Sequence, residues 1–427
     1  MKTQPTQPVN LDEEIAKTRP DYRVYRPREP VGSAHDTGNE HFLVFDSPDG
    51  SLMAVWTQST TEGQSDQRIV FARSEDEGEH WTAPRIVAGP SKPGEGPMAS
   101  WGFPLVSRSG RIYVIYSRHI GVNDIFTHTT GLMASIYSDD LGQSWSSEQI
   151  IAMPRSRWDH PDPAVPANWI VWQKPLRLSQ GKYYAGFTRW VSPAVRPPAP
   201  RQVWWAEASV VEFMRFENVD DNPQPADLQI SYFMSNEKAL QVGLVGFPEV
   251  PVVQEPSIVP LPDGRLFCVM RATTGSPYYT VSADEGVTWR KPEPLHQYDG
   301  GPVLPHPCSP CPFYSMDEGE YFFLYHNHDG HFAGWGPEDG TYHRRPICLA
   351  RGLFRPQARQ PVWFSEPWYF MDHGGVPILR GDLAMYASVT YDAEGAVLWY
   401  PERKFFLLGK KIPRRMLAGM KVTGKEG

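Results

Sequence analysis

Cysteine is scarce in this 427-residue chain, which contains four: Cys268, Cys308, Cys311 and Cys348. Four thiols in a chain of this length do not form a disulfide scaffold. Cys308 and Cys311 have the spacing of half a zinc site, but no second pair of cysteines or histidines stands at a matching distance. We therefore expect reduced, partly buried thiols, with no metal and no cofactor.

Long apolar runs are also missing. No segment approaches the length that spans a bilayer, and residues 1–20 lack the apolar centre of a signal peptide. We expect either a cytoplasmic protein or an exported one whose signal has been trimmed. The formal net charge of −8 argues against a nucleic-acid or anionic-membrane partner. Nothing in the sequence indicates the oligomeric state.

Turn-forming and aromatic residues are abundant, with 36 Gly, 43 Pro, 15 Trp and 19 Tyr. This composition is typical of a turn-rich, mostly β protein. Aromatic richness also suits a surface that binds sugars, although packing in a core is its commoner use.

One short motif occurs three times, as "SEDEGEHW" (74–81), "SDDLGQSW" (138–145) and "SADEGVTW" (282–289). In each copy the Asp carboxylate can accept hydrogen bonds from backbone N–H groups ahead of it, while the Gly takes a positive φ. The final Trp can then cover the turn. The motif predicts three equivalent tight hairpins and a structural role.

A second pattern repeats six times: a short apolar segment, a glycine turn and another apolar segment, which together read as a β-hairpin. A further strand follows each hairpin, so six four-stranded units predict an all-β, six-bladed β-propeller. The alternative is a chance series of hairpins in a β-sandwich. We expect residues 1–21 to form an N-terminal extension, 22–415 one propeller domain closed by the segment 22–27, and 416–427 a tail. The turn glycines are Gly50, Gly110, Gly181, Gly264, Gly319 and Gly395.

Counting from these glycines predicts which residues meet at the opposite face, near the axis. Arginines, acids, histidines and tryptophans gather there, and buried charges cost free energy unless they are paired or used. Ion pairs between neighbouring blades are the alternative use. Nine positions before the glycine stand His41, Trp101, Trp172, Glu255, Pro310 and Tyr386. Seven or eight positions after it stand Thr57 or Gln58, Arg118, Arg189, Arg271, His326, and Glu402 or Arg403.

Several cations around a pocket favour an anionic ligand, because arginine grips a carboxylate with two donors. Tyr386 and Glu255 could act as nucleophile and base, with the carboxylate drawing the phenolic proton. His41 could act as a general acid or base, or bond a neighbouring blade. Trp101 and Trp172 could stack on a sugar ring or plug the axis.

These residues resemble the sialidase (neuraminidase) superfamily over roughly residues 40–410. The repeated motif is similar to its Asp-box, and "QEPSIVPLPDGRLFCVMR" (254–271) resembles the sialidase hairpin that carries a Glu and a triad arginine. The resemblance implies Tyr386 as nucleophile, Glu255 beside it, and Arg271 as a carboxylate-binding arginine. "HRRPICLARG" (343–352) resembles the strand with another triad arginine, which would be Arg344 or Arg345.

The first triad arginine of sialidases is missing. "GNEHFLVF" (38–45) replaces the family's Arg-Ile-Pro motif and places Glu40 or His41 at that position. The candidates for the acid/base carboxyl are Glu62 and Asp66. Arg118 and Arg189 could then grip the acidic group from other blades.

Two further segments carry expectations. "YHNHDGHF" (325–332) holds three histidines and could bind a metal, but only His326 is expected to point inward, and we expect a solvated loop. "PERKFFLLGKKIPRR" (401–415) is basic and reads as a solvated last strand.

The sequence as a whole predicts an exo-acting glycoside hydrolase that releases a terminal acidic sugar from a glycan. One alternative is a polysaccharide lyase or rhamnosidase acting on uronate-containing glycans. The other is a carbohydrate-binding propeller without catalysis.

Overall fold

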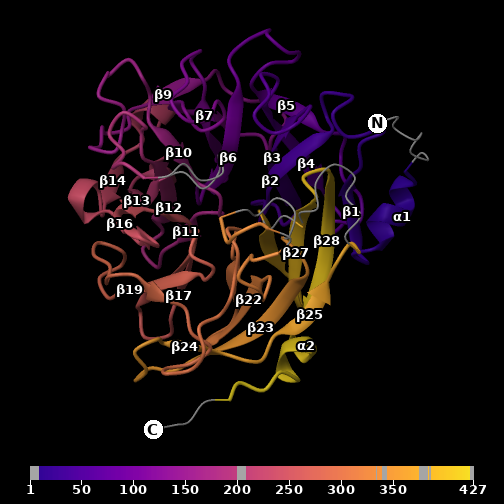
Figure 1. The fold of residues 1–427 in the computed structure, drawn as a ribbon. Helices are drawn as coiled ribbons and strands as arrows, with labels where there is room; N and C mark the ends of the chain where they lie inside the picture. The colour runs from indigo at the N-terminus through magenta and orange to yellow at the C-terminus, as the bar shows by residue number, and fades with distance from the viewer. Residues whose placement is uncertain are drawn as a thin grey trace, which may run out of the picture.

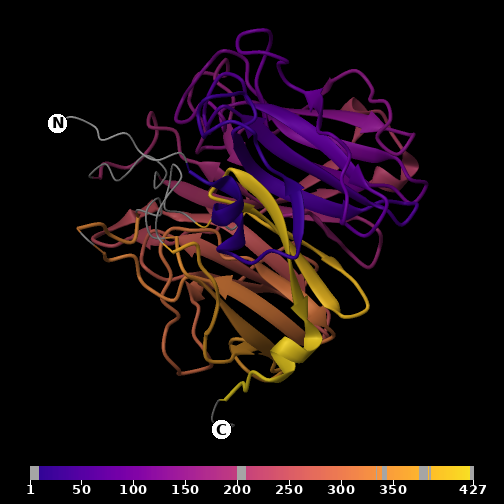
Figure 2. The same ribbon diagram turned by 90° about the vertical axis from the view of Figure 1, so that its right-hand side faces the viewer.

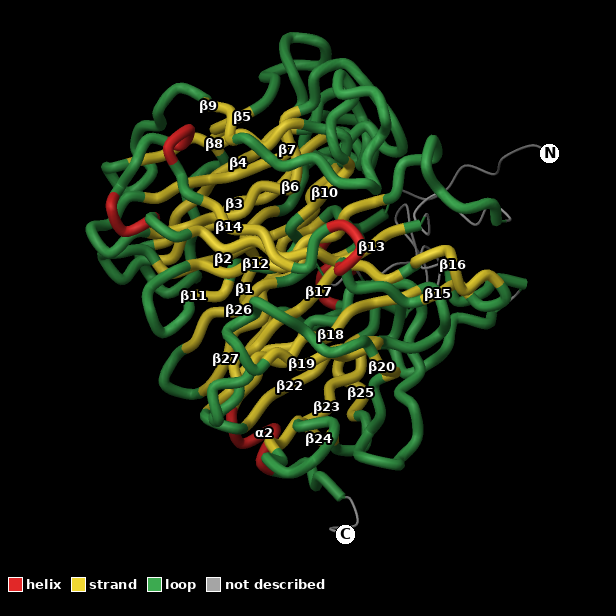
Figure 3. Tube along the Cα trace, turned by 90° about the vertical axis from the view of Figure 1, so that its left-hand side faces the viewer, coloured by secondary structure: helices red, strands yellow, loops and turns green. Residues whose placement is uncertain are grey.

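The computed structural model describes residues 9–199, 208–332, 334–338, 344–374, 383 and 386–423. These residues form six blades, each an antiparallel sheet whose strands follow one another outward from the axis. Figure 1 shows the blades in chain order around a ring, and Figure 3 shows that strands make up the body of the molecule. The predicted six-bladed, all-β propeller is confirmed.

The first three blades hold the N-terminal half of the chain. The third differs from the others because its innermost strand is interrupted between β10 and β11, where residues 171–175 leave the sheet. The first blade is β2 (Gly38–Asp46), β3 (Leu52–Ser59), β4 (Arg68–Ser74) and β5 (Arg85–Ala88). The second is β6 (Ala99–Val106), β7 (Ile112–Arg118), β8 (Leu132–Ser138) and β9 (Gln149–Ile151). The third is β10 (Asn168–Ile170), β11 (Leu176–Arg177), β12 (Tyr183–Trp190), β13 (Ser209–Phe216) and β14 (Ile230–Phe233).

Short 3-10 turns and a small separate hairpin connect the third blade to the fourth. The turns are η2 (Val219–Asp221), η3 (Pro225–Asp227) and η4 (Asn236–Lys238), and the hairpin is β15 (Gly243–Leu244) with β16 (Phe247–Pro251). The fourth blade is β17 (Val253–Pro260), β18 (Leu266–Ala272), β19 (Tyr278–Ser282) and β20 (Glu293–Pro294). The fifth is β21 (Phe313–Asp317), β22 (Glu320–Tyr325), β23 (Ile347–Phe354), β24 (Val362–Phe364) and β25 (Trp368–Met371).

The sixth blade joins the two ends of the chain. β26 (Ser388–Tyr391), β27 (Gly395–Glu402) and β28 (Phe406–Pro413) come from the C-terminal part, and β1 (Tyr22–Tyr25) supplies the outermost strand. Tyr22 lies opposite Gly409 in this pairing, and its ring packs 5.2 Å from that of Trp399. The predicted closing strand in residues 22–27 is therefore present. Figure 2 shows the indigo N-terminal segment beside the yellow last blade.

Both short helices pack onto this closing blade. α1 (Leu11–Ala16) buries Ile15, and α2 (Arg414–Ala418) buries Leu417, in one apolar cluster with strands of the fifth and sixth blades. The described parts of the predicted N-terminal extension and C-terminal tail are thus packed against the propeller. None of the described helices is long and apolar enough to cross a membrane.

The three repeated motifs connect the third and fourth strands of blades one, two and four. In the third copy, Asp284 accepts hydrogen bonds from the Ser282 hydroxyl (2.8 Å) and from the backbone and hydroxyl of Thr288 (2.8 and 2.6 Å). Gly286 has φ +85°, and its backbone lies against Tyr184 of the preceding blade. The motif joins neighbouring blades as well as closing a turn.

Candidate active site

The same backbone bulge opens the inner strand of blades one, two and four, at the end of the axis opposite the hairpin turns. His41, Trp101 and Glu255 occupy it with left-handed φ values of 53°, 57° and 52°, and the strand register shifts at each one. The N–H of Glu255 donates to the Thr188 hydroxyl of the preceding blade at 2.7 Å. Such bulges re-aim side chains and are frequent beside active sites.

Tyr386, Glu255 and Arg271 are in direct contact at this end of the axis. The Tyr386 hydroxyl donates to Glu255 Oε1 at 2.9 Å, and Arg271 Nη1 lies 3.1 Å from the phenol oxygen and 2.7 Å from Glu255 Oε2. All three side chains are at most 4 % exposed. Tyr386 lies two residues before β26, and Glu255 and Arg271 face each other across the hairpin of β17 and β18. The arrangement can accept a proton from a phenol and hold negative charge.

Burial and charge set the proton affinities in this group. Burial raises the pKa of Tyr386 to about 12, with Arg271 opposing and Glu255 adding to the shift. Burial also raises the pKa of Glu255, against the positive charges of Arg271 and Arg344. A carboxylate that holds its proton more tightly is a better base toward a phenol. Gln254 fixes Arg271, because its Oε1 accepts from Arg271 Nε and Nη2 at 3.0 and 2.6 Å.

A second group of charged side chains lies beside the Tyr386 ring. Lys404 Nζ is 5.1 Å from the centre of that ring, and it bonds Glu62 Oε2 at 2.6 Å and Glu40 Oε2 at 3.1 Å. Burial, then the charge of Glu62, raises the pKa of Glu40 to about 8, although Lys404 opposes the shift. Two carboxyls that share one cation can retain a proton near neutral pH.

Asp66, the other candidate acid, is held apart from this group. Its Oδ2 accepts from the backbone N–H and hydroxyl of Thr60 at 2.9 and 2.6 Å, and lies 2.9 Å from His35 Nδ1. These contacts fit an acid that fixes a loop. Of the two candidates, the structure brings only Glu62 to Lys404 and the Tyr386 ring.

Aromatic rings enclose the phenol of Tyr386. Its ring centre lies 5.3 Å from that of Trp101 and 6.3 Å from that of Trp172, while His41 packs 5.0 Å from Trp101. Burial lowers the pKa of His41 to about 3, against an opposing contact from the Trp172 backbone. His41 is therefore a neutral ring at ordinary pH, which is a poor state for a general acid.

Arg344 is the nearer arginine of the pair Arg344 and Arg345: it is buried, and its charge acts on both Glu255 and Tyr386.

Four other predicted site residues point elsewhere in the part of the chain that the structure describes. Counting from the turn glycines predicts where a strand ends, but partners elsewhere in the chain determine the direction of its last side chain. Arg118 pairs with Glu148 at 2.5 Å, Arg189 with Asp159 at 2.7 Å and Glu212 at 3.1 Å, Arg345 with Asp372 at 2.6 Å, and His326 Nε2 with the Ser309 hydroxyl at 2.9 Å.

The predicted substrate contacts of Arg118, Arg189, Arg345 and His326 stay predictions. The ion pairs of the three arginines lie within single blades or their entry loops, so they are not the pairs between neighbouring blades that were the alternative. Within the described ranges, no three His, Cys, Asp or Glu side chains are grouped to hold a metal ion.

Counting from Gly395 placed Glu402 or Arg403 near the axis, but sequence reasoning missed Lys404 and read the segment 401–415 as a solvated last strand. That expectation is wrong for the start of the segment: Arg403 and Lys404 are 2 % and 8 % exposed, and Arg403 Nη1 bonds Glu14 at 2.6 Å. Both residues have left-handed φ values in the turn between β27 and β28. A signal was available, because a basic pair directly after a strand that returns to the axis can reach the acids of the first blade.

Comparison with known proteins identifies the family of this chain. The family model of the BNR repeat-like domain matches residues 50–397, most of the chain. The chain belongs to this family. No functionally curated protein matches this BNR repeat-like protein.

Solved structures match its fold over nearly the whole chain. The NanB sialidase from Streptococcus pneumoniae aligns with a TM-score of 0.59 at 11% identity, covering 92% of this chain and 71% of that one. A leech intramolecular trans-sialidase gives 0.58 at 14%, covering 93% and 71%. A Dyadobacter fermentans protein of unknown function gives 0.57 at 11%, covering 92% and 96%. The family model confirms the predicted BNR-type repeats, and the solved structures confirm the sialidase-like six-bladed fold.

Proposed function

We propose that this protein is an exo-acting glycoside hydrolase that releases a terminal acidic sugar from a glycan. The observation that carries the proposal is the buried contact of the Tyr386 phenol with the Glu255 carboxylate and the Arg271 guanidinium. Binding a sugar needs no phenol poised to lose its proton to a carboxylate, whereas covalent catalysis does.

In the proposed retaining reaction, the Tyr386 oxygen attacks the anomeric carbon while its proton passes to Glu255. The glycosidic carbon–oxygen bond breaks, and the leaving oxygen takes a proton from Glu62. Water then displaces the phenol oxygen from the anomeric carbon and loses a proton to Glu62, and Tyr386 recovers its own proton from Glu255. The contact of Lys404 with both the Glu62 carboxyl and the Tyr386 ring supports Glu62 over Asp66 as the acid.

Arg271 and Arg344 are proposed to bind the acidic group of the sugar. Arg344 is 6 % exposed and donates from Nη2 to the Cys308 carbonyl at 3.0 Å, while its Nε has no hydrogen-bond partner among the described residues. A buried guanidinium with an unused donor suits a carboxylate.

The group at Lys404 favours a second candidate function. Lys404 lies beside the Tyr386 ring, but Glu40, which stands where the resemblance places the missing triad arginine, and Glu62 already share its charge. A substrate carboxylate would have to compete with them there, whereas sugar hydroxyls would not. A uronate carries its carboxylate away from the anomeric carbon that Tyr386 would attack, so a uronate-containing glycan, cleaved by hydrolysis or by elimination, is the alternative substrate.

Hydrolysis of a fluorogenic α-sialoside by the wild-type chain and by Tyr386→Phe tests the proposal. We expect wild-type release and a loss of about 10³-fold or more in kcat for the variant. Tyr391→Phe is the matched control, because it removes a phenol oxygen that bonds only the Ser315 carbonyl at the other end of the axis.

Absence of release from the wild-type chain would contradict the sialic-acid substrate. The next substrate is then a uronate-containing polysaccharide, and ultraviolet absorbance of an unsaturated uronate separates a lyase from a hydrolase.

A further inference from the structure

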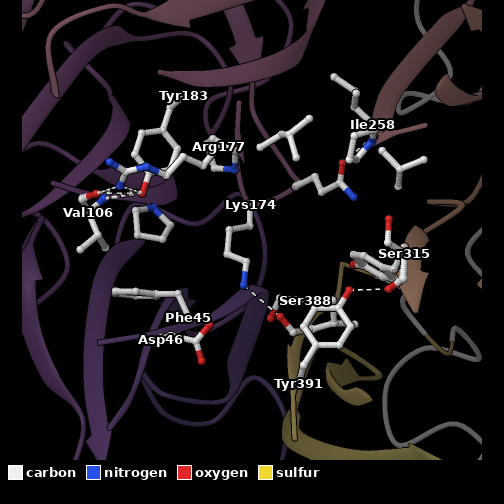
Figure 4. A pocket seen from close by; sticks show the side chains of 18 of the residues that line it. Phe45, Asp46, Val106, Lys174, Arg177, Tyr183, Ile258, Ser315, Ser388 and Tyr391 are labelled. Carbon is white, nitrogen blue, oxygen red and sulfur yellow. Dashed lines mark hydrogen bonds between the residues drawn. The ribbon is translucent and has the colours of Figure 1, made fainter. Parts of the chain in front are cut away.

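A second cavity lies at the hairpin end of the axis, opposite Tyr386. Its volume is about 620 Å³, within the range of small-molecule sites. The ends of the innermost strands of all six blades line it, as seen in residues such as Asp46, Val106, Arg177, Pro260, Ser315 and Tyr391. Figure 4 shows Asp46, Val106, Arg177, Ser315 and Tyr391 around a central lysine, Lys174.

The interrupted inner strand of the third blade separates the two ends of the axis. Trp172 contacts Tyr386 on one side, and the next two residues, Gln173 and Lys174, line the cavity on the other. Both Gln173 amide atoms are used, since Nε2 donates to the Ser257 hydroxyl at 2.8 Å and Oε1 accepts from the Ile258 N–H at 2.9 Å. The cavity is therefore a site distinct from the one at Tyr386.

Lys174 brings a positive charge to this cavity without an ion pair to a described residue. Its Nζ donates to the carbonyls of Val389 (2.9 Å) and Val44 (3.2 Å), which uses two of its three N–H bonds. Burial lowers the pKa of Lys174, and the Asp46 charge only partly opposes this. A cation in such a setting gains most from an anion of its own.

The two arginines and the phenols of the wall already have partners, and Arg108 Nε lies 3.2 Å from Asp220. Arg177 binds both carboxylate oxygens of Asp220 at 2.7 Å. The Tyr183 and Tyr391 hydroxyls donate to the carbonyls of Val106 and Ser315, at 2.8 and 2.6 Å. Both phenols line the cavity with their hydroxyls already used. Apolar side chains complete the wall: Phe45, Pro48, Pro104, Pro175, Val259 and Pro260.

We propose that this cavity binds a small organic monoanion, with its carboxylate on Lys174 and its apolar ring or chain against the prolines and tyrosines. One unpaired ammonium and an apolar wall suit a single negative charge with an apolar body better than a phosphate, which carries more charge and needs more donors. Asp46, exposed at the same cavity, disfavours a second negative charge. This inference does not depend on the proposed reaction at Tyr386.

Calorimetric titration of the full chain with 1-naphthoate and with its neutral isostere 1-naphthamide tests the proposal. We expect the acid to bind at least about tenfold more tightly than the amide, and Lys174→Met to weaken the acid about tenfold or more, since hydrogen bonds to charged groups are the strong ones. The Lys174→Met variant loses two carbonyl contacts, so its circular dichroism is recorded alongside.

A second variant changes the charge in the opposite direction with little risk to folding. Asp46→Asn removes the negative charge beside Lys174, and we expect it to tighten naphthoate binding about two- to fivefold. Glu318→Gln is the matched control: this exposed acid also lies at a hairpin turn but does not line the cavity, and its change should leave binding as in the wild type. Equal binding of acid and amide overturns the proposal. So does acid binding that neither Lys174→Met nor Asp46→Asn changes, because such binding does not involve Lys174.

Discussion

Glu255 reaches Tyr386 because its own backbone is left-handed. A φ of 52° costs a residue other than glycine roughly 1–2 kcal/mol, and the hydrogen bond from its N–H to Thr188 helps to hold the bulge. The same conformation at His41 and Trp101 turns their side chains toward the axis. Side chains from separate blades thereby converge at one point.

Glu62 and Asp66 can be distinguished by substitution. We expect Glu62→Gln to lower kcat about 10²- to 10⁴-fold, with a larger loss for substrates whose leaving group needs protonation. Asp66→Asn should instead lower the free energy of unfolding by about 1–3 kcal/mol, because it weakens acceptor contacts to Thr60 and His35. Rates with activated and unactivated aglycones, together with denaturant titrations, separate the two. A greater loss of turnover in Asp66→Asn would reverse the assignment.

The sequence predicts residue positions better than residue partners. Counting nine back from a hairpin glycine found His41, Trp101 and Glu255, because turn length and strand register are constant across those blades. The same counting could not predict that Arg189 turns to Asp159 or that Lys404 enters from a turn after β27, since these depend on loops from other parts of the chain.

At the scale of elements, each repeated motif is a contact between two blades. Gly78 lies against Trp399, Gly142 against Phe71 and Gly286 against Tyr184, in each case an aromatic residue of the preceding blade. The motif was predicted as a stabilised hairpin, which it is. Its partner across the blade interface could not be predicted from local sequence, because the partner strand lies far away in the chain.

Two glycines with the same backbone conformation test this contact. Gly286 and Gly264 both have φ +85°, but a Cβ on Gly286 would lie 2.3 Å from the Tyr184 ring, whereas a Cβ on Gly264 meets nothing within 4 Å. We expect Gly264→Ala to destabilise the protein by about 1–2 kcal/mol from backbone strain alone, and Gly286→Ala by a further 1–3 kcal/mol or so from overpacking. Thermal unfolding of the two variants compares them. Equal losses of stability would show that the Tyr184 ring can move away from the added methyl group without further destabilising the protein.

The inner strand of the third blade shows how an interruption can create a site. The six hairpins were predicted from glycine turns, and the third hairpin is present as β11 and β12. The break before it, at residues 171–175, was not predicted. It places Gln173 and Lys174 across the axis, where their contacts to blades one, four and six depend on the closed ring.

For the whole molecule, buried ionisable groups predict a stability maximum in mildly acidic to neutral solution. Burial lowers the pKa of His41 and of His306 to about 3, so only the unfolded chain takes up these protons, and the free energy of unfolding falls as the pH drops below 6.5. Burial raises the pKa of Glu40 to about 8, so the folded chain keeps a proton that the unfolded chain releases near 4.5. The free energy of unfolding then falls again as the pH rises toward about 8.

Denaturant titrations between pH 4 and pH 9 measure this profile. We expect Glu40→Gln to flatten the alkaline side by at least about 1 kcal/mol, since one pKa unit corresponds to about 1.4 kcal/mol. His306→Gln should flatten the acid side. A Glu40→Gln profile that still falls between neutral pH and pH 8 as steeply as the wild type would assign the alkaline loss to another group, such as Glu255.

Because β1 pairs with β28, the first strand can pair only after the last strand has been synthesised. β1 leaves the ribosome before any blade has formed, and its partner is the last strand to be made. At roughly 5–20 residues per second, the intervening chain takes on the order of tens of seconds to produce. During that time the first strand has no sheet to join, and any chain that stops before residue 406 lacks the strand that β1 pairs with. The nascent protein thus carries an unpaired edge strand until β28 has been made, and truncation before β28 leaves that strand without its partner.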